Sequence, residues 1–391
     1  MDGNRVGIIG GSIAGCAAAI VLRQAGCDVT VFERSSGVLR DRGHGVSLSG
    51  ETRAELVDAD LIDADLPARP LSERSWFVRD GDAPLGRLVW QQPFSGIVHN
   101  WGMLWANLRD RVPGTDYRDG VPVNRIESAD DGVTVYLDGG EAERFDLVIG
   151  ADGYRSLVRA AVDPAAEPTS SGYVLWRGGY PITELPQPIP EVLYEQSVTI
   201  AFPGGHAMVM IIPGDGGPRV YWAVYHQPAE PLPPEADHLA PADFPGLDTT
   251  LSQHFPPYWA EMVDRTRRDT TVIHPVLDIR TSRYTAPRLA LLGDAATMTR
   301  PHTGSGAVKA VQDALALGRL RREHGDWATV LAEYDAVRRP AGTALVDLGR
   351  RIGEAQVIST PPWDSMTPDD FTAWIQSVLS GRRLYLYDNL R

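Results

Sequence analysis

Three glycine-centred turns, widely separated along the 391 residues, constrain the fold of this chain more than any other feature. They lie at residues 10–15 (Gly-Gly-Ser-Ile-Ala-Gly), 150–153 (Gly-Ala-Asp-Gly) and 293–294 (Gly-Asp). Each follows an apolar run typical of a buried strand. Turns of this kind leave backbone N–H groups free to bind the phosphates of a dinucleotide. One such turn would be weak evidence, but three in this order predict a domain that holds one extended dinucleotide.

The first turn belongs to a predicted βαβ unit, with strands at 5–10 and 28–33 and a helix at 12–25. Ser12 takes the middle glycine position of the usual G-x-G-x-x-G pattern, and its hydroxyl can cap the helix or bind phosphate. Glu33 ends the second strand, where a carboxylate binds ribose hydroxyls. A purely structural turn followed by a solvated acid is the alternative. The predicted dinucleotide contacts are Gly10, Ser12, Ile13, Ala14, Gly15 and Glu33.

The other two turns add a flavin to this picture. Asp152 can cap a following helix and Gly153 gives backbone freedom, so the second turn taken alone is structural more often than functional. Asp294 ends a buried strand and is a natural acceptor for ribityl hydroxyls. Residues 304–306 precede a helix whose positive N-terminal end could stabilise negative charge on a reduced flavin ring. Together the turns predict FAD as the cofactor.

Between the dinucleotide-type segments the sequence alternates as antiparallel sheet does, with short strands expected at 75–78, 87–90 and across 173–225. A Pro- and acid-rich stretch at 227–246 favours a surface excursion. The predicted fold class is α/β, with a discontinuous Rossmann-type FAD-binding domain, an inserted antiparallel-sheet substrate domain and a helical C-terminal tail. We place the FAD-binding domain at 1–70, 99–165 and 285–350, the substrate domain at 71–98 and 166–284, and a C-terminal loop and helix at 351–391.

Composition excludes several kinds of partner. The net charge of -14 argues against nucleic acid and against an anionic membrane surface. No apolar run approaches the length of a membrane span, and a first strand beginning by Arg5 predicts that no signal peptide precedes it. Cys16 and Cys27 are separated by helical positions that span about 16 Å, too far for a disulfide. Reduced thiols of this kind favour a cytoplasmic protein.

The combination resembles the single-component flavoprotein aromatic hydroxylases, the para-hydroxybenzoate hydroxylase class. The matching parts are the glycine loop with Glu33, the segment 150–153, and the Gly-Asp-Ala-Ala and Pro-x-x-Gly-x-Gly patterns within 293–306. Residues 173–178, 300–302 and 309–310 look like the 2,6-dihydroxypyridine 3-hydroxylase branch. The resemblance implies an FAD monooxygenase that takes hydride from NADPH or NADH. It would activate O2 as a flavin C4a-hydroperoxide and hydroxylate a small aromatic or heteroaromatic substrate.

The resemblance also assigns roles to single residues. Arg34 and Val123 are further cofactor-binding positions, and Arg42 matches an arginine that contacts FAD and helps receive the nicotinamide nucleotide. Asp152 belongs to a segment linked to both FAD and NAD(P)H, and Asp294 to the ribityl chain. The residues expected against the isoalloxazine are Pro301, Gly304, Ser305, Gly306 and Ala307. The chain departs from the family pattern at Ser12, at His44, at Asn100 and Trp101, which replace a His-Arg pair, and at Val308.

On the substrate side, a pocket base that removes a ring-hydroxyl proton would make the ring a better nucleophile. His302, beside Pro301, is the first candidate for this catalytic role because its segment lies near the flavin; His206 and His226 are weaker candidates. Aromatic residues on such strands are core more often than pocket. The substrate candidates are Trp176, Arg177, Trp222, Tyr225 and His226.

Other functions are compatible with part of these features. A flavin-dependent halogenase needs a lysine near a separate substrate site, and the only lysine, Lys309, is in the flavin-side helix. An epoxidase, an oxidase or a non-catalytic FAD-binding relative also stays open, although a passive binder has little use for the third turn. A plain NAD-dependent dehydrogenase does not explain residues 293–294. The substrate, the position oxidised, the choice between NADH and NADPH, and assembly into a homodimer are left undecided.

Overall fold

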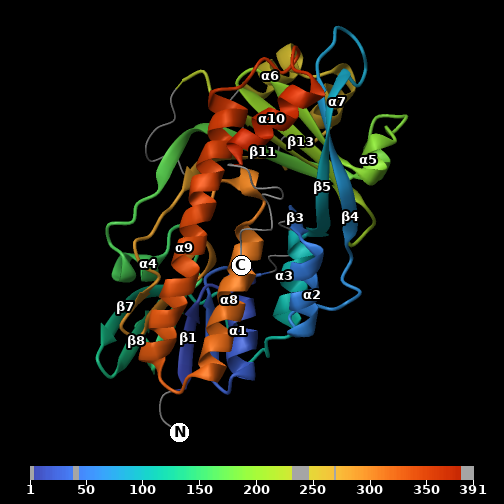
Figure 1. Ribbon diagram of the computed structural model, residues 1–391. Helices are drawn as coiled ribbons and strands as arrows, with labels where there is room; N and C mark the ends of the chain where they lie inside the picture. The colour runs from blue at the N-terminus through green and yellow to red at the C-terminus, as the bar shows by residue number, and fades with distance from the viewer. Residues whose placement is uncertain (1–3, 38–43, 231–245, 268–269, 380–391) are drawn as a thin grey trace.

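The structure is a computed structural model that describes residues 4–37, 44–230, 246–267 and 270–379. Figure 1 shows two regions, one built around β1, α1 and α8 and the other around β4, β5, β11 and β13. The long helix α9 (Trp327–Gly353) extends from the first region to the second. None of the described helices is long and apolar enough to cross a membrane.

The first region is a six-stranded sheet in the order β16-β17-β10-β1-β2-β6, parallel throughout except for the β16–β17 edge pair. Its central strand is buried on both faces, as its apolar run predicts for a parallel strand. The strands are β1 (Arg5–Ile9), β2 (Asp28–Glu33), β6 (Tyr117–Asp119), β10 (Leu147–Gly150), β16 (Thr285–Ala286) and β17 (Leu289–Leu291). The helices around it are α1 (Ile13–Gln24), α2 (Gly50–Asp58), α3 (Trp101–Asp110), α4 (Leu157–Val162) and α8 (Gly306–Glu323). A small antiparallel sheet, β7 (Val123–Ala129), β8 (Gly132–Leu137) and β9 (Ala142–Phe145), is attached.

The second region is an eight-stranded sheet in the order β15-β11-β14-β13-β12-β4-β5-β3. All of its pairs are antiparallel except β12–β4. The strands are β3 (Gly45–Leu48), β4 (Arg69–Val78), β5 (Arg87–Asn100), β11 (Thr169–Pro181), β12 (Ser197–Phe202), β13 (Gly205–Ile212), β14 (Arg219–His226) and β15 (Val272–Asp278). The predicted fold class is therefore confirmed.

The two faces of this second sheet have different partners. On β14, Trp222 and Val224 pack into a core with α6 (Gly246–His254) and α7 (Pro257–Asp264). The alternate residues Tyr221 and Tyr225 belong to a cluster on the opposite face. Because side chains alternate along a strand, one face of the sheet is closed by helices and the other is left for a site.

The C-terminal segment covers the β4–β5 end of the second sheet (Figure 1). Helix α9 ends in a π-helical turn, η6 (Glu354–Ile358), and α10 (Pro368–Val378) follows with a capping box between Thr367 and Asp370. Stacked and edge-on rings join α10 to the strands; the cluster contains Trp76, Trp90, Trp363, Phe371 and Trp374. The tail is thus a packed part of the structure up to residue 379.

Most predicted elements are present, but the hairpin of β4 and β5 is much longer than expected. The pairing of the two strands shifts register between Leu71 and Glu73 and again between Trp76 and Phe77. Such bulges break the strict alternation from which strand length is judged. The predicted excursion at 227–246 lies almost wholly outside the described residues. The six domain segments stay a prediction, although β3, at residues 45–48, joins the second sheet.

A buried ion cluster ties α8 and α9 to the third glycine turn. The Asp313 carboxylate accepts hydrogen bonds from Lys309 Nζ at 2.7 Å, from Arg338 Nε at 2.7 Å and from the Gly293 N–H at 3.0 Å. Lys309 Nζ also donates to the Gly293 carbonyl at 3.0 Å. Burial lowers the pKa of Lys309, yet the Asp313 carboxylate outweighs that effect and the net pKa is raised. The lysine therefore holds the turn, which removes the residue that a halogenase would need.

We predict that Asp313→Asn destabilises the fold by about 3–5 kcal/mol, because it leaves two buried cations without their counter-charge. The measurement is the free energy of unfolding in denaturant. Arg319→Gln is the matched control on the same helix, since it removes only an exposed pair with Glu323 and should change stability by less than about 1 kcal/mol. Equal effects of the two substitutions would contradict the role of the cluster.

Candidate active site

The glycine positions of the first turn have no room for a side chain. Gly10 has φ +101°, and a Cβ there would lie 2.3 Å from the Ala151 carbonyl oxygen in the second turn. A Cβ on Gly15 would lie 1.9 Å from the Gly10 carbonyl oxygen. The two turns therefore touch through backbone, as the sequence predicts for a cradle around one extended molecule.

The peptide carbonyl of Gly11 is fixed by three side chains. It accepts hydrogen bonds from Trp105 Nε1 at 2.9 Å, from the Tyr117 hydroxyl at 3.0 Å and from the Cys16 thiol at 3.2 Å. In the preceding peptide group, the Gly11 N–H donates to Glu33 Oε2 at 2.8 Å. The loop is thus held in one orientation, with the acid of β2 against it.

The helix N-terminus at this loop is available to an anion. Ser12 is the N-cap of α1 but makes no side-chain capping bond, and the first turn of the helix contains no acidic residue. Its hydroxyl and the positive end of the helix are therefore left for a phosphate. Ile13 and Ala14 are buried at the start of α1, Arg34 is exposed directly after β2, and Val123 is half-buried at the start of β7.

The second turn combines a helix contact with an unused acceptor. Asp152 Oδ2 accepts a hydrogen bond from the Leu157 N–H at 2.8 Å, and burial raises the pKa of this carboxyl. Its Oδ1 is buried and has no partner among the described residues. The formal N-cap of α4 is Ser156 rather than Asp152. Asp152 therefore keeps one oxygen for a bound molecule.

The third turn lies against the first two. The Leu292 N–H donates to the Gly150 carbonyl at 2.9 Å, and a Cβ on Gly293 would lie 3.1 Å from the Ala14 Cβ. Asp294 is the exposed residue within an otherwise buried run, so its carboxylate faces outward from the junction of the turns. The three predicted turns thus meet at one place.

The start of α8 resembles the start of α1 in its electrostatics. Gly304 has φ +61°, Ser305 is the N-cap without a capping bond, and the first turn holds no acid. Gly306 and Ala307 are half-buried there. These backbone cradles, the unpaired Asp152 oxygen and two free helix N-termini fit an FAD molecule. Arg42 lies outside the described residues.

A cavity of about 150 Å³ lies between the second sheet, the turn η5 (Pro301–Thr303) and η6. Polar side chains line its sheet side and its C-terminal side, and they are His44, Ser47, Arg74, Arg177, Ser197, His206, Tyr221, Tyr225 and Gln356. From the side of α8 it is lined by Pro301, His302 and Gly304. The cavity therefore adjoins the helix end expected to face the flavin.

His302 is surrounded by aromatic side chains. Its Nε2 is 2.7 Å from the Tyr173 hydroxyl, and its ring centroid is 4.4 Å from that of Tyr225 and 5.3 Å from that of His206. Burial, followed by the charges of His206 and Arg300, lowers the pKa of His302 well below its ordinary value. Burial likewise lowers the pKa of His206 to about 3. Both imidazoles are therefore neutral at neutral pH.

Three predicted substrate residues do not line the cavity. Trp176 and Trp222 are packed in the core on the opposite face of the sheet, and His226 accepts a hydrogen bond from Trp176 Nε1 at 3.0 Å. The cause is strand alternation, which turns these three side chains away from Arg177 and Tyr225. The prediction that Trp176, Trp222 and His226 contact the substrate is therefore corrected. The cavity brings together four other predicted residues, Arg177, Tyr225, Pro301 and His302.

Sequence reasoning missed Tyr173, which contacts His302, and several residues that line the cavity, among them Arg74, Tyr221 and Gln356. For Tyr173, the period-two pattern that it shares with Arg177 on β11 was the available signal. Gln356 reaches the cavity from η6, and no sequence pattern predicts a π-helical turn.

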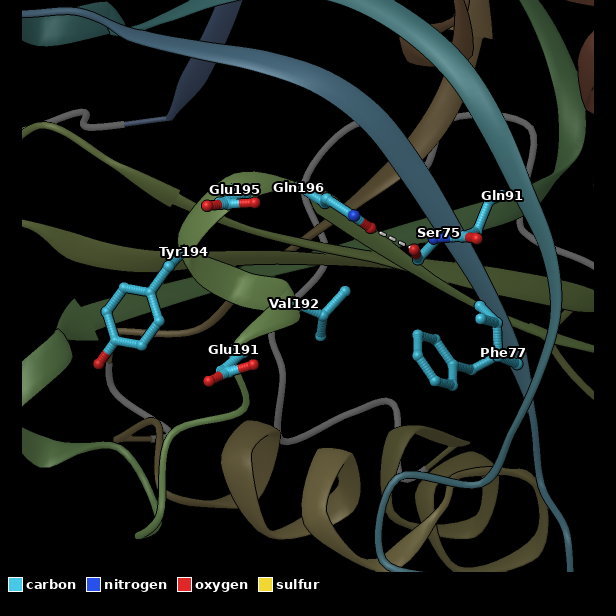
Figure 2. A pocket seen from close by; sticks show the side chains of 9 residues that line it. Ser75, Phe77, Gln91, Glu191, Val192, Tyr194, Glu195 and Gln196 are labelled. Carbon is cyan, nitrogen blue, oxygen red and sulfur yellow. Dashed lines mark hydrogen bonds between the residues drawn. The ribbon is translucent and has the colours of Figure 1, made fainter.

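Figure 2 shows a second, larger hollow of about 550 Å³ beside β4 and α5 (Val192–Glu195). Two of its lining polar side chains are already engaged in hydrogen bonds. Ser75 bonds to Gln196, and Gln196 Nε2 donates to Glu73 at 2.7 Å. It contains no predicted site residue, so we place the candidate active site in the smaller cavity.

Two family models match this chain. One, described as an FAD binding domain, matches residues 102–349, and another, described as pyridine nucleotide-disulphide oxidoreductase, matches residues 5–52. The chain belongs to the FAD-binding-domain family. The first match includes the second and third turns and the His302 segment, and the second includes the first turn and Glu33.

Individual relatives agree with this assignment. The 2,6-dihydroxypyridine 3-monooxygenase of Paenarthrobacter nicotinovorans is 26% identical over 366 residues, 88% of this chain and 89% of the relative. The solved 2,6-dihydroxypyridine-3-hydroxylase of Arthrobacter nicotinovorans has a TM-score of 0.80 at 24% identity, covering 94% and 95% of the two chains. Klebsiella pneumoniae HpxO, solved with FAD and uric acid, has a TM-score of 0.76 at 27% identity, covering 96% and 92%.

The chain is thus an FAD-dependent monooxygenase of a family that includes aromatic and heteroaromatic hydroxylases. The predicted family and the FAD cofactor are confirmed, and the use of NAD(P)H and O2 fits this family. Which individual residues contact FAD stays a prediction.

We predict that Gly10→Ala binds FAD at least about tenfold more weakly than the unmodified chain, because the new Cβ forces the first and second turns apart. The measurements are the flavin-to-protein ratio after purification and the dissociation constant on reconstitution. Gly50→Ala, at an open position, is the control. An unchanged dissociation constant in Gly10→Ala would contradict the role of the cradle.

Proposed function

We propose that this monooxygenase hydroxylates a small aromatic or heteroaromatic ring in the cavity between η5 and the second sheet, with NADPH or NADH as the reductant. The observation that carries the proposal is the position of His302. This imidazole lines the cavity, and it is four residues before the start of α8, whose free N-terminus is expected to face the flavin. When bound, FAD supplies reduction by NAD(P)H and the activation of O2.

His302 is proposed as the base that removes the ring-hydroxyl proton. Its Nδ1 is buried and has no hydrogen-bond partner among the described residues. If Nδ1 is to accept a proton, Nε2 must carry the other one and donate it to the Tyr173 oxygen. Burial raises the pKa of Tyr173 to about 12, so this phenol stays protonated and neutral while it orients the imidazole.

The surroundings of His302 limit its movement and its access to water. Arg300 and Arg350 both donate to the buried Asp278 carboxylate, at 2.9 Å and 2.6 Å, and this holds the backbone just before the histidine. Pro301 then fixes φ at the start of η5. Tyr225 covers one side of the ring. A neutral base held in this way can accept a proton only from a molecule that enters the cavity.

We expect NADPH or NADH to bleach the enzyme-bound flavin under anaerobic conditions when a suitable ring compound is present. The first compounds to test are 2,6-dihydroxypyridine and urate, and the measurement is the flavin absorbance after rapid mixing. Admission of O2 should restore the colour and yield a hydroxylated product. Failure of both reductants to bleach the flavin with every ring compound in a broad screen would overturn the proposed function.

His302→Gln should lower the rate of product formation by about 10²- to 10⁴-fold without loss of FAD, because it removes the proton acceptor. The pH profile gives a second readout. Protonation of His302 as pH falls would remove the base, but its depressed pKa puts that loss well below the ordinary range. The rate of the unmodified enzyme should therefore show no inflection near pH 6.5, the usual histidine value. His324→Gln, on the surface beside Glu333, serves as the control. An inflection at about 6.5 that disappears in His302→Gln would refute the neutral buried base.

The remaining expectations belong to the same proposal. The homodimer, the cytoplasmic location and the preference between NADH and NADPH are predictions that sedimentation, fractionation and paired kinetics can test. The C-terminal tail has two possible roles, contact with a second subunit or closure of the pocket. The position of Gln356 in the cavity lining supports closure of the pocket.

A further inference from the structure

The cavity is positively charged in a strongly acidic protein. Arg74 and Arg177 line it, and no aspartate or glutamate is among its described lining residues. The histidines His206 and His302 contribute no positive charge at neutral pH, since burial lowers the pKa of both. The whole chain has a net charge of -14, so two guanidinium groups without a lining carboxylate stand out against the rest of the molecule.

Arg177 is the lining cation that lacks a partner. Its Nε is buried without a hydrogen-bond acceptor, and no described side chain forms an ion pair with its guanidinium. Arg177 as a whole is half-buried, whereas the buried arginines Arg300 and Arg338 are paired with Asp278 and Asp313. An unpaired buried donor is unfavourable unless a ligand supplies the acceptor. The guanidinium therefore points to a ligand that carries negative charge.

The register of the sheet places Arg177 close to the proposed base. Arg177 pairs with Ala223 on β14, which pairs with Met208 on β13. The adjacent row on the same face holds Tyr225 and His206, which lie beneath His302. Two residues along a strand span about 6.8 Å, roughly the length of a six-membered ring with one substituent. Ala223, between Arg177 and Met208, is small and leaves space above the sheet.

Gln356 adds a second unused donor. Its side chain is buried, its Nε2 has no partner among the described residues, and it lines the same cavity. The π-helical turn η6 brings it there from the end of α9. An amide N–H and a guanidinium in one small cavity both need acceptor oxygens.

We infer that the substrate ring carries an anionic oxygen, either a carboxylate or a ring-bound oxide, which Arg177 binds while His302 faces a ring hydroxyl. This inference rests on the proposed function and narrows its substrate class to anionic aromatic compounds. Gln356 donates to an oxygen of the same ligand. Arg177 and Gln356 are specificity residues and take no part in proton transfer.

The test is equilibrium binding to the FAD-loaded enzyme, followed by the change in flavin absorbance, so that no turnover is needed. The matched probes are 4-hydroxybenzoate and 4-hydroxybenzamide, which differ in charge at one substituent, together with 2,6-dihydroxypyridine and urate, which bear only ring oxygens. The variants are Arg177→Gln, Arg177→Lys and Gln356→Leu. Arg319→Gln, exposed on α8, is the control.

We expect at least one anionic probe to bind at least about tenfold more tightly than 4-hydroxybenzamide. Arg177→Gln should weaken the binding of that probe by about 10- to 100-fold, and Arg177→Lys should restore part of the lost affinity. The dissociation constant of the neutral amide should change by less than about threefold in either variant. If only 4-hydroxybenzoate loses affinity, the anionic group of the substrate is a carboxylate. If only 2,6-dihydroxypyridine or urate loses affinity, it is a ring oxide. Both outcomes support the inference.

Equal binding of neutral and anionic probes, an unchanged preference in Arg177→Gln, or no binding of any anionic probe would overturn it. If Arg177→Gln loses FAD or melts at a lower temperature, Gln356→Leu serves as the second test variant. It must weaken binding of the same anionic probe if the inference holds.

Failure of the proposed function would give a different experimental result. In that case the probes discriminate by charge, but none of them speeds the consumption of NADPH or NADH.

Discussion

The close backbone contact among three glycine turns is the constraint on which the rest of this structure depends. Gly10 has no space for a side chain against Ala151, and a Cβ on Gly293 would lie 3.1 Å from the Ala14 Cβ at the start of α1. Segments from the beginning, the middle and the last third of the chain must therefore meet before the cradle exists. That meeting fixes where β1, β10 and β17 end, and so where the second sheet can be inserted. The discontinuous domain is a consequence of this contact.

Buried charge then holds the meeting point in place. Asp313 binds the Gly293 N–H directly and is itself held by Lys309 and Arg338. Asp278 does the same for the segment before η5 through Arg300 and Arg350. Both clusters connect α9 to a loop of the site, so the long helix in Figure 1 serves as a common support for the third turn and for the proposed base. A chain with one lysine uses it here, in packing rather than in catalysis.

The sequence alone was sufficient wherever a local pattern has one structural solution. Strand 28–33 and the helix after the first turn were predicted because period and turn chemistry agree. The pattern was insufficient where the outcome depends on which face of a strand meets the core. Trp176 and Arg177 are neighbours in sequence, and both were predicted at the substrate, yet packing of α6 and α7 buries the tryptophan on the far face. The contribution of Gln356 depends on an irregular helix end, which tertiary contacts decide.

Two kinds of unpaired polar group occur in the site, and each suits a different ligand. At the three turns the free groups are backbone N–H donors and one carboxylate oxygen, which suit phosphate and hydroxyl groups of a cofactor. In the cavity they are side-chain donors, on Arg177 and Gln356, beside a neutral imidazole. A neutral ring would leave those donors without acceptors, whereas an anionic ring satisfies them and brings its own counter-charge into the cavity. The protein therefore needs no acidic residue there, and an acid would compete with the ligand for the arginine. The arginines of the cavity lack a counter-charge, and an anionic ligand would supply it. This is why the cavity can be basic in a protein with a net charge of -14.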